Sequence, residues 1–156
     1  MRWTRTRLGC LLALSVSGCS SASVAVTEVL NQGNCIALDA GVHAVTLEEF
    51  ARLKGRRMIG SISTPPDKSA DTQRLIAISR GEQPSAGYAL EYIAASTTTG
   101  DEIEVIVRWH EPAADAVVAQ VITQPCLVLG LPDAASGQVS VRLEDGTSLG
   151  SIPAIH

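Results

Sequence analysis

Histidine and serine are the residue types in this chain that could support nucleophilic catalysis, and their spacing does not favour it. A serine nucleophile needs a base within reach, and many hydrolases present it in a Gly-x-Ser-x-Gly turn. Residues 60–63 lack the closing glycine, and the Gly-x-Ser-x-Gly letters at residues 146–150 lie between two predicted strands rather than at a turn from a strand into a helix. The three histidines lie in a strand-like run (His43), at a strand end (His110) and at the last position (His156). We therefore expect no catalytic residues and a protein that is not an enzyme.

Metal-ligating side chains are present, but not in the spacings that metal sites use. No His or Cys spacing matches a zinc site. Asp67 and Asp71 flank Lys68 in a loop that lacks the glycine of an EF-hand, so the sequence does not support a calcium-binding site. Four acidic residues near one turn are more typical of a solvated face than of a carboxylate pair: Glu91, Asp101, Glu102 and Glu104. We expect no metal and no cofactor.

The first eighteen residues have the parts of a bacterial secretory signal peptide. Arginines at positions 2, 5 and 7 precede an apolar run at residues 8–16, which is too short to span a bilayer. The run ends in Val16-Ser17-Gly18-Cys19, which resembles the lipobox of bacterial lipoproteins, whose cysteine is acylated and becomes N-terminal after cleavage. We expect residues 1–18 to be removed and Cys19 to carry the lipid, palmitate included. The alternative is an ordinary signal peptide with Cys19 as a free thiol.

Export and anchoring determine the expected location and charge. Ser20, rather than an aspartate, follows Cys19, which resembles sorting to the outer membrane. Loss of the leader removes three arginines and no acids, which shifts the formal net charge from −4 to −7. Such an acidic export product has no electrostatic basis for binding nucleic acid. We expect a periplasm-facing lipoprotein of the cell envelope, attached to the outer membrane, with the inner membrane as the alternative.

Two cysteines, Cys35 and Cys126, are left once Cys10 has been removed with the leader and Cys19 has been acylated. Leftover cysteines in an oxidising periplasm usually pair. The alternative is two separately buried thiols. A bridge that closes a loop of about ninety residues would stabilise the fold by roughly 4 kcal/mol.

After a short tether at residues 19–23, residues 24–156 are predicted to form a single β-rich domain. Short apolar or alternating runs between Gly and Pro turns predict strands near 24–30, 35–38, 42–46, 75–78, 88–94, 103–110, 117–123, 126–131, 139–143 and 148–152. A capping box, Thr46-Leu47-Glu48-Glu49, predicts one short helix near 46–54. Residues 64–73 contain two prolines and are expected to be a loop. The pattern favours a small antiparallel β-sandwich or barrel with one helix.

The loop at residues 81–88 combines turn residues with an aromatic side chain at the start of a strand. Its glycines permit backbone angles closed to other residues, and its proline fixes φ. Tyr88, Leu90 and Tyr92 are expected on one face of the strand. A loop held by two strands can bind a partner, here through Gly81, Gln83, Pro84, Ser85, Gly87 and Tyr88. The alternative is a structural turn, with Tyr88 in the core.

Several features between Arg74 and Gly146 occur together in one known family. They are a strand ending in Gly81, the Gln83–Tyr88 loop, a charged strand ending in Glu111-Pro112, and residues 121–125 before an apolar strand. With them the region resembles the C-terminal domain of the PrcB family, secreted bacterial proteins named for a non-catalytic subunit of a protease complex. The family's loop often reads Gly-Lys-Pro-Thr-Gly-Gly-Tyr, from which Glu82-Gln83 and Ser85-Ala86 depart mildly. The resemblance implies an exported accessory domain whose partner is a protein such as an envelope protease.

A second similarity concerns the loop alone. Residues 83–88 loosely resemble the Asn-Pro-Thr-Thr-Gly-Tyr loop of chagasin-type cysteine-protease inhibitors. The expected function is a non-catalytic, protein-binding accessory role, with membrane contact through the N-terminal lipid. The alternatives are a purely structural envelope lipoprotein and a chagasin-like inhibitor.

Overall fold

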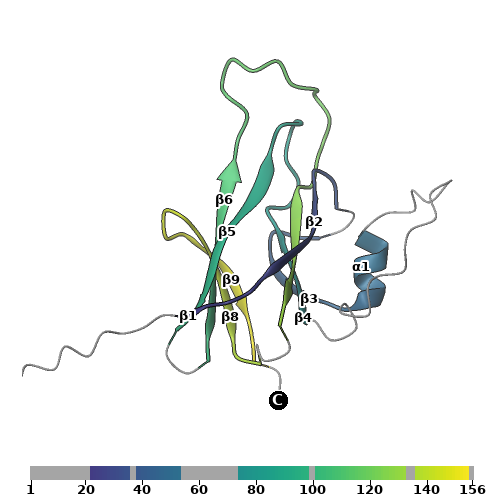
Figure 1. Ribbon diagram of the computed structural model, residues 1–156. Coiled ribbons are helices and arrows are strands. Elements are labelled where there is room, and N and C mark those ends of the chain that lie inside the picture. Colours follow the sequence, from purple (N-terminus) through teal and green to yellow (C-terminus); the bar gives the residue numbers. More distant parts are fainter. Residues whose placement is uncertain (1–21, 36–37, 54–73, 99–100, 133–135, 155–156) are drawn as a thin grey trace, which may run out of the picture.

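Two β-sheets packed face to face form the protein (Figure 1). The computed structural model of the chain describes residues 22–35, 38–53, 74–98, 101–132 and 136–154. Sheet A has the order β1 (Ala22–Ser23), β5 (Ala89–Thr97), β6 (Ile103–His110), β8 (Val139–Leu143) and β9 (Ser148–Ile152). Sheet B has the order β2 (Thr27–Gln32), β7 (Cys126–Leu131), β4 (Arg74–Ser79) and β3 (Gly41–Val45). The predicted mainly β sandwich with one short helix is confirmed, and the described strands do not close into a barrel.

Aliphatic side chains fill the space between the sheets. In β6, Ile103, Val105 and Val107 are buried while the residues between them are partly exposed, which is the alternation predicted from the sequence. Sheet B contributes Ile76 and Ile78 from β4 and Leu127, Leu129 and Leu131 from β7. This core holds the two sheets together and supports the loops at their ends.

The two central strands of sheet B, β4 and β7, are buried on both faces. Every residue of β7 is buried, and so is every residue of β4 except Arg74. This explains why both segments are continuous apolar runs in the sequence rather than alternating ones. On the outer face of the sheet, Ala77 and Val128 pack in a second cluster with Leu53 of α1 (Leu47–Leu53). The helix therefore covers the face of sheet B that points away from sheet A (Figure 1).

The helix α1 begins at the predicted capping box. Thr46 Oγ1 accepts a hydrogen bond from the Glu49 N–H (3.2 Å), and Glu49 Oε2 accepts one from the Thr46 N–H (2.8 Å). The bond from the Thr46 backbone is the main cause that lowers the pKa of the Glu49 carboxyl. The predicted end of the helix at residue 54 and the predicted loop at 64–73 lie outside the described residues.

Two of the predicted strands are corrected by the structure. Residues 117–123 form no strand, and only Thr123 takes part in an isolated bridge, with Gln83. The segment is rich in β-branched residues, but a strand also needs a partner along its length, which these residues lack within the described part of the chain. Cys35 is not in a strand either, because its backbone N–H bonds to Gln124 O (2.8 Å) and its side chain is in a disulfide. Residues 36–37 lie outside the described residues.

Two further differences concern how strands pair. The last two residues of the predicted tether, Ala22 and Ser23, form β1 and pair with Thr97 and Ser96. The described strand pairs are antiparallel except β6 and β8, which run parallel. They are parallel because the chain leaves sheet A after β6, forms β7 in sheet B, and only then returns as β8.

Candidate interaction site

Two connections meet at one end of the sandwich. One joins β4 to β5, and the other joins β6 to β7 and projects beyond the ends of the sheets, at the top of Figure 1. We call residues 81–88 and 112–123 together the rim. The predicted binding loop is thus one half of a larger unit, whose other half comes from a segment that was predicted to be a strand.

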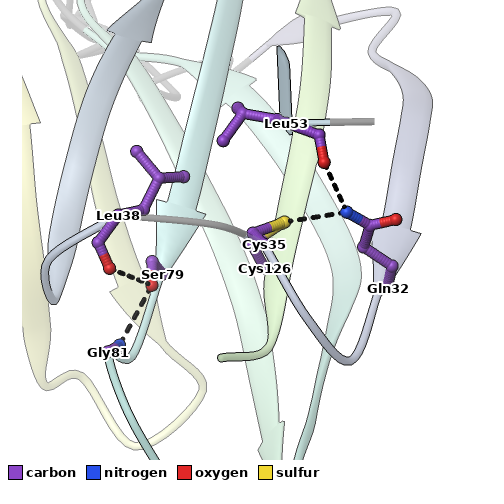
Figure 2. Close-up of a disulfide and its surroundings, with 7 residues drawn as sticks. All are labelled: Gln32, Cys35, Leu38, Leu53, Ser79, Gly81 and Cys126. Carbon is purple, nitrogen blue, oxygen red and sulfur yellow. Dashed lines mark hydrogen bonds between the residues drawn. A yellow bond between two sulfur atoms is a disulfide. The ribbon is translucent and has the colours of Figure 1, made fainter. Parts of the chain in front are cut away.

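The loop begins at a fixed point, the end of β4. The buried Ser79 Oγ accepts a hydrogen bond from the Gly81 N–H (3.0 Å) and donates one to Leu38 O (3.3 Å) (Figure 2). Gly81 has a φ of +70°, and a Cβ at this position would lie 3.4 Å from the Cβ of Ala40. The position therefore favours glycine for its backbone angle.

Backbone hydrogen bonds fasten the loop to the second segment. Gln83 and Thr123 exchange two of them, at 2.7 and 3.0 Å. The Ala86 N–H donates to Ala119 O (2.9 Å), and Thr123 Oγ1 donates to the carbonyl oxygen of the buried Ser85 (2.8 Å). Four backbone groups of the loop thus bond to residues 119–123.

Gly87 allows the closest approach between the two halves of the rim. Its φ is +97°, and a Cβ at this position would lie 3.1 Å from Pro112 Cβ and 3.3 Å from Val118 Cγ1. Both the angle and the space therefore require glycine. Gly81, Gln83, Ser85 and Gly87 make structural contacts in the rim, and whether they also touch a partner stays a prediction.

A stacked aromatic pair connects the rim to β6. The rings of Tyr88 and Trp109 stack with their centroids 5.5 Å apart, and the Arg80 guanidinium lies 4.6 Å from the Trp109 ring centroid. Trp109 Nε1 donates to Glu111 Oε1 (2.9 Å). Tyr88 is half-buried, so it lies between the two alternatives considered for it, a surface anchor and a core residue.

The second half of the rim exposes apolar side chains that the sequence analysis assigned to a strand. Val117 is fully exposed, Ile122 is 69% exposed and Val121 is 53% exposed. They account for three of the five large hydrophobic side chains that are exposed in the described part of the chain, and they lie within six residues of each other. A cluster of this kind on a held segment is typical of an interaction site.

Exposed acidic residues lie along both segments of the rim. Glu82, Glu111 and Asp115 are all exposed and lie in or beside the rim. Among the described residues they form no ion pair, in contrast to the carboxylates on the outer face of sheet A. The rim is therefore apolar with an acidic border.

Arg108 of β6 joins two carboxylates on the outer face of sheet A. Its guanidinium donates to both oxygens of Glu144 (2.6 and 2.7 Å) and to Glu91 (3.0 Å), and His110 Nε2 lies 2.7 Å from the same Glu91 oxygen. The bond with His110 is the main cause that lowers the pKa of Glu91, and the bond with Arg108 is the main cause that lowers the pKa of Glu144. These side chains are about half exposed, so the network is a surface feature with a modest effect on stability.

An open depression of about 320 Å³ lies beside β3 and α1. It is lined by Leu38, His43, Ala44, Val45, Glu49, Arg52 and Leu53. Its polar groups are already engaged: His43 Nε2 with Asp39 O (3.0 Å), Glu49 with the helix cap, and Arg52 with Glu48. We assign no site to it.

The predicted disulfide between Cys35 and Cys126 is confirmed (Figure 2). The Cα atoms are 5.8 Å apart, within the range for disulfides, and both residues are fully buried. Gln32 Nε2 donates to Leu53 O (2.8 Å) and to Cys35 Sγ (3.4 Å). The bridge therefore ties the start of β7, just after the rim, to the segment that follows β2, while Gln32 at the end of β2 bonds to the end of α1.

The remaining predicted site residues either lie outside the described residues or are not brought together by the fold. Cys19, His156 and residues 60–71 lie outside the described residues, so lipid attachment stays a prediction. The predicted acidic face divides, because Glu91 pairs with Arg108 whereas Glu104 pairs with Arg142 (3.2 Å). Over the described ranges, no three His, Cys, Asp or Glu side chains gather where they could hold a metal ion. None of the described helices has the length and apolar character to cross a membrane.

Comparison with known proteins identifies the region that carries the rim. Residues 74–132 match the family model described as PrcB C-terminal. No curated protein and no solved structure gives a significant match to the chain. The match runs from the first residue of β4 to just beyond β7, so it includes both halves of the rim and stops short of Gly146, where the resemblance was expected to end. The resemblance to the PrcB C-terminal family that the sequence predicted is therefore confirmed for residues 74–132.

Proposed function

We propose that this protein is an exported, lipid-anchored accessory protein that binds a component of an envelope protease complex through the rim. The observation that carries the proposal is the exposure of Val117, Val121 and Ile122 on a segment held by the loop. Exposed apolar side chains gathered on one short segment favour binding because a partner that covers them removes apolar surface from water. The family name supports a protease complex as the source of the partner.

The placement of the rim fits a chain anchored at its N-terminus. β1 pairs with Ser96 and Thr97, at one end of β5, whereas Ala89 at the other end pairs with His110, next to the rim. At about 3.3 Å per residue, β5 separates these ends by roughly 25 Å. A protein attached to a membrane through Cys19 would therefore carry the rim on the side away from β1.

An inhibitor that inserts residues 81–88 into a protease cleft has less support. Pro84 is exposed, but Ser85 is buried and Gln83 and Ala86 use their backbone N–H groups to bond residues 119–123. These groups of the loop are bonded within the protein and are therefore not available to a protease cleft.

A photo-crosslinking amino acid at position 122, in the full-length protein expressed in its own bacterium, tests the binding role. We expect an adduct with a protease or protease subunit, identified by mass spectrometry. The matched control places the same amino acid at Ser151, an exposed residue of β9 towards the other end of sheet A. Equal adducts from both positions, or none from position 122, would contradict the proposal.

The anchor is tested separately. Cys19→Ala should abolish labelling by a fatty-acid probe and release the protein from the membrane fraction, because no other thiol follows the small residues of the lipobox. Unchanged labelling of this variant would show that Cys19 is not acylated.

A further inference from the structure

We infer that residues 116–122 are a docking strand, to which an extended segment of a protein partner adds edge to edge through main-chain hydrogen bonds. The inference rests on the proposed function, because it states how the rim engages its partner. It starts from a conflict between the sequence, which favours a strand here, and the structure, which supplies no strand to pair with it.

The backbone of this segment is largely unused. From Val117 to Ile122, no backbone N–H group donates a hydrogen bond to another residue of the described chain. The carbonyl of Ala119 accepts one from the loop, and that of Val118 accepts a long one from Gln120 Nε2 (3.4 Å). A row of free donors and acceptors on an exposed segment is a template for another strand.

One edge of the segment is occupied by the loop and the other is open. In a paired strand, alternate residues direct their N–H and C=O groups to opposite edges. Ala119 and Thr123 both bond to the loop. Val118, Gln120 and Ile122 would therefore present their backbone groups to the open edge, where a partner can pair.

The side chains suit the same role. The segment reads Ala116-Val117-Val118-Ala119-Gln120-Val121-Ile122, and four of these seven residues are Val or Ile, the types that strands prefer. Val117, Val121 and Ile122 are exposed and would be covered by side chains of an added strand. A strand that forms only with a partner accounts for both the composition and the exposure.

The border charges indicate the chemistry of the partner. Glu82, Glu111 and Asp115 favour an apolar, β-prone segment flanked by Lys or Arg. A second copy of this chain would bring these acids against one another. An anionic lipid surface would be repelled by them, and it would have to lie at the end of the sandwich opposite β1.

The test uses a fluorescent peptide in which valine and threonine alternate between pairs of lysines, and the full-length protein in detergent. We expect binding by fluorescence anisotropy that weakens as salt rises. On binding, hydrogen exchange should slow at the amides of residues 118, 120 and 122. Gln120→Pro removes a free-edge N–H that bonds to nothing in the described chain and should weaken binding at least tenfold. The matched control, Gln120→Ala, loses the same side chain and should bind as the parent does.

Each other outcome overturns the inference in a recognisable way. Equal binding by Gln120→Pro and Gln120→Ala, or peptide binding without slower exchange in the parent protein, would show that the main chain is not the contact. No binding at about 1 mM peptide, tighter binding to anionic vesicles, or a dimer in sedimentation would exclude the stated occupant. None of these outcomes decides the proposed function, which depends on crosslinking from position 122. The exchange measurement uses the parent protein, so it stands even if the proline variant fails to fold.

Discussion

Replacement of Gly87 by alanine tests whether the two halves of the rim are packed against each other. The new Cβ meets Pro112 Cβ at 3.1 Å and Val118 Cγ1 at 3.3 Å, on a backbone with a φ of +97°. Two other glycines serve as controls that separate the cost of the backbone angle from the cost of the close contacts. Gly146 has a φ of +88° with nothing within 4 Å of its added Cβ, and Gly33 has neither a positive φ nor a close neighbour.

The expected losses of unfolding free energy follow from these environments. Gly33→Ala should leave stability unchanged or raise it by about 0.4 to 1 kcal/mol. Gly146→Ala should cost about 1 to 2 kcal/mol for the backbone angle alone. Gly87→Ala should cost the same plus about 1 to 3 kcal/mol for displacing its two neighbours, about 2 to 5 kcal/mol in total.

Urea unfolding followed by tryptophan fluorescence measures these losses. Trp109 stacks on Tyr88 beneath the rim, and the other tryptophan, Trp3, lies in the leader that we expect to be removed. The same variant should also bind the test peptide more weakly, because Val118 must move. A Gly87→Ala loss within about 0.5 kcal/mol of the Gly146→Ala loss would refute the packing argument.

Variants at three further places test other parts of the structure. Replacement of Cys35 and Cys126 together by alanine should lower the free energy of unfolding by about 4 to 5 kcal/mol, given the separation of 91 residues, and reduction of the parent should match it in a urea titration. Tyr88→Ala should lower it by about 1 to 2 kcal/mol and Tyr88→Phe by much less, as measured by thermal melting, because the half-buried ring contributes mainly through stacking. Glu144→Gln should be less stable than the parent at pH 7, and the difference should shrink as the pH falls below the ordinary carboxyl value of 4.5 and vanish below the lowered pKa of Glu144. The bond with Arg108 lowers the pKa of Glu144, so the stabilisation is present above its unfolded value and lost as the pH falls through its folded value; a difference that persists at pH 2 would contradict this.

Sequence patterns predicted those elements that a short stretch of neighbouring residues is enough to specify. The alternation in β6, the two short strands at 139–143 and 148–152, and the capping box at Thr46 each depend on a few neighbouring residues, and each is found where it was expected. The disulfide was predicted from the expected compartment and from the lack of other free cysteines, which needs no knowledge of the fold.

The rim could be predicted only in part, because its contacts join residues that are far apart in the chain. Nothing near Gly87 shows that Pro112 and Val118 lie against it, so the glycine could be assigned to a turn but not to a packing contact. Residues 117–123 have the composition of a strand, and the absence of a pairing partner is a property of the whole fold. The prolines at 112 and 125 were a usable signal, since they bracket the segment and each removes a backbone donor that a continuous ladder would need.

The parallel pairing of β6 with β8 affects the order in which the protein can fold. Between these neighbours the chain passes through the rim and β7, so their hydrogen bonds cannot form as a local hairpin would. Contacts that close such long loops are made late and slowly. Until β8 arrives, the edge of β6 that faces it is open and can pair with other chains. We therefore expect the C-terminal hairpin of β8 and β9 to complete folding, and the unfinished chain to be the form most prone to aggregation.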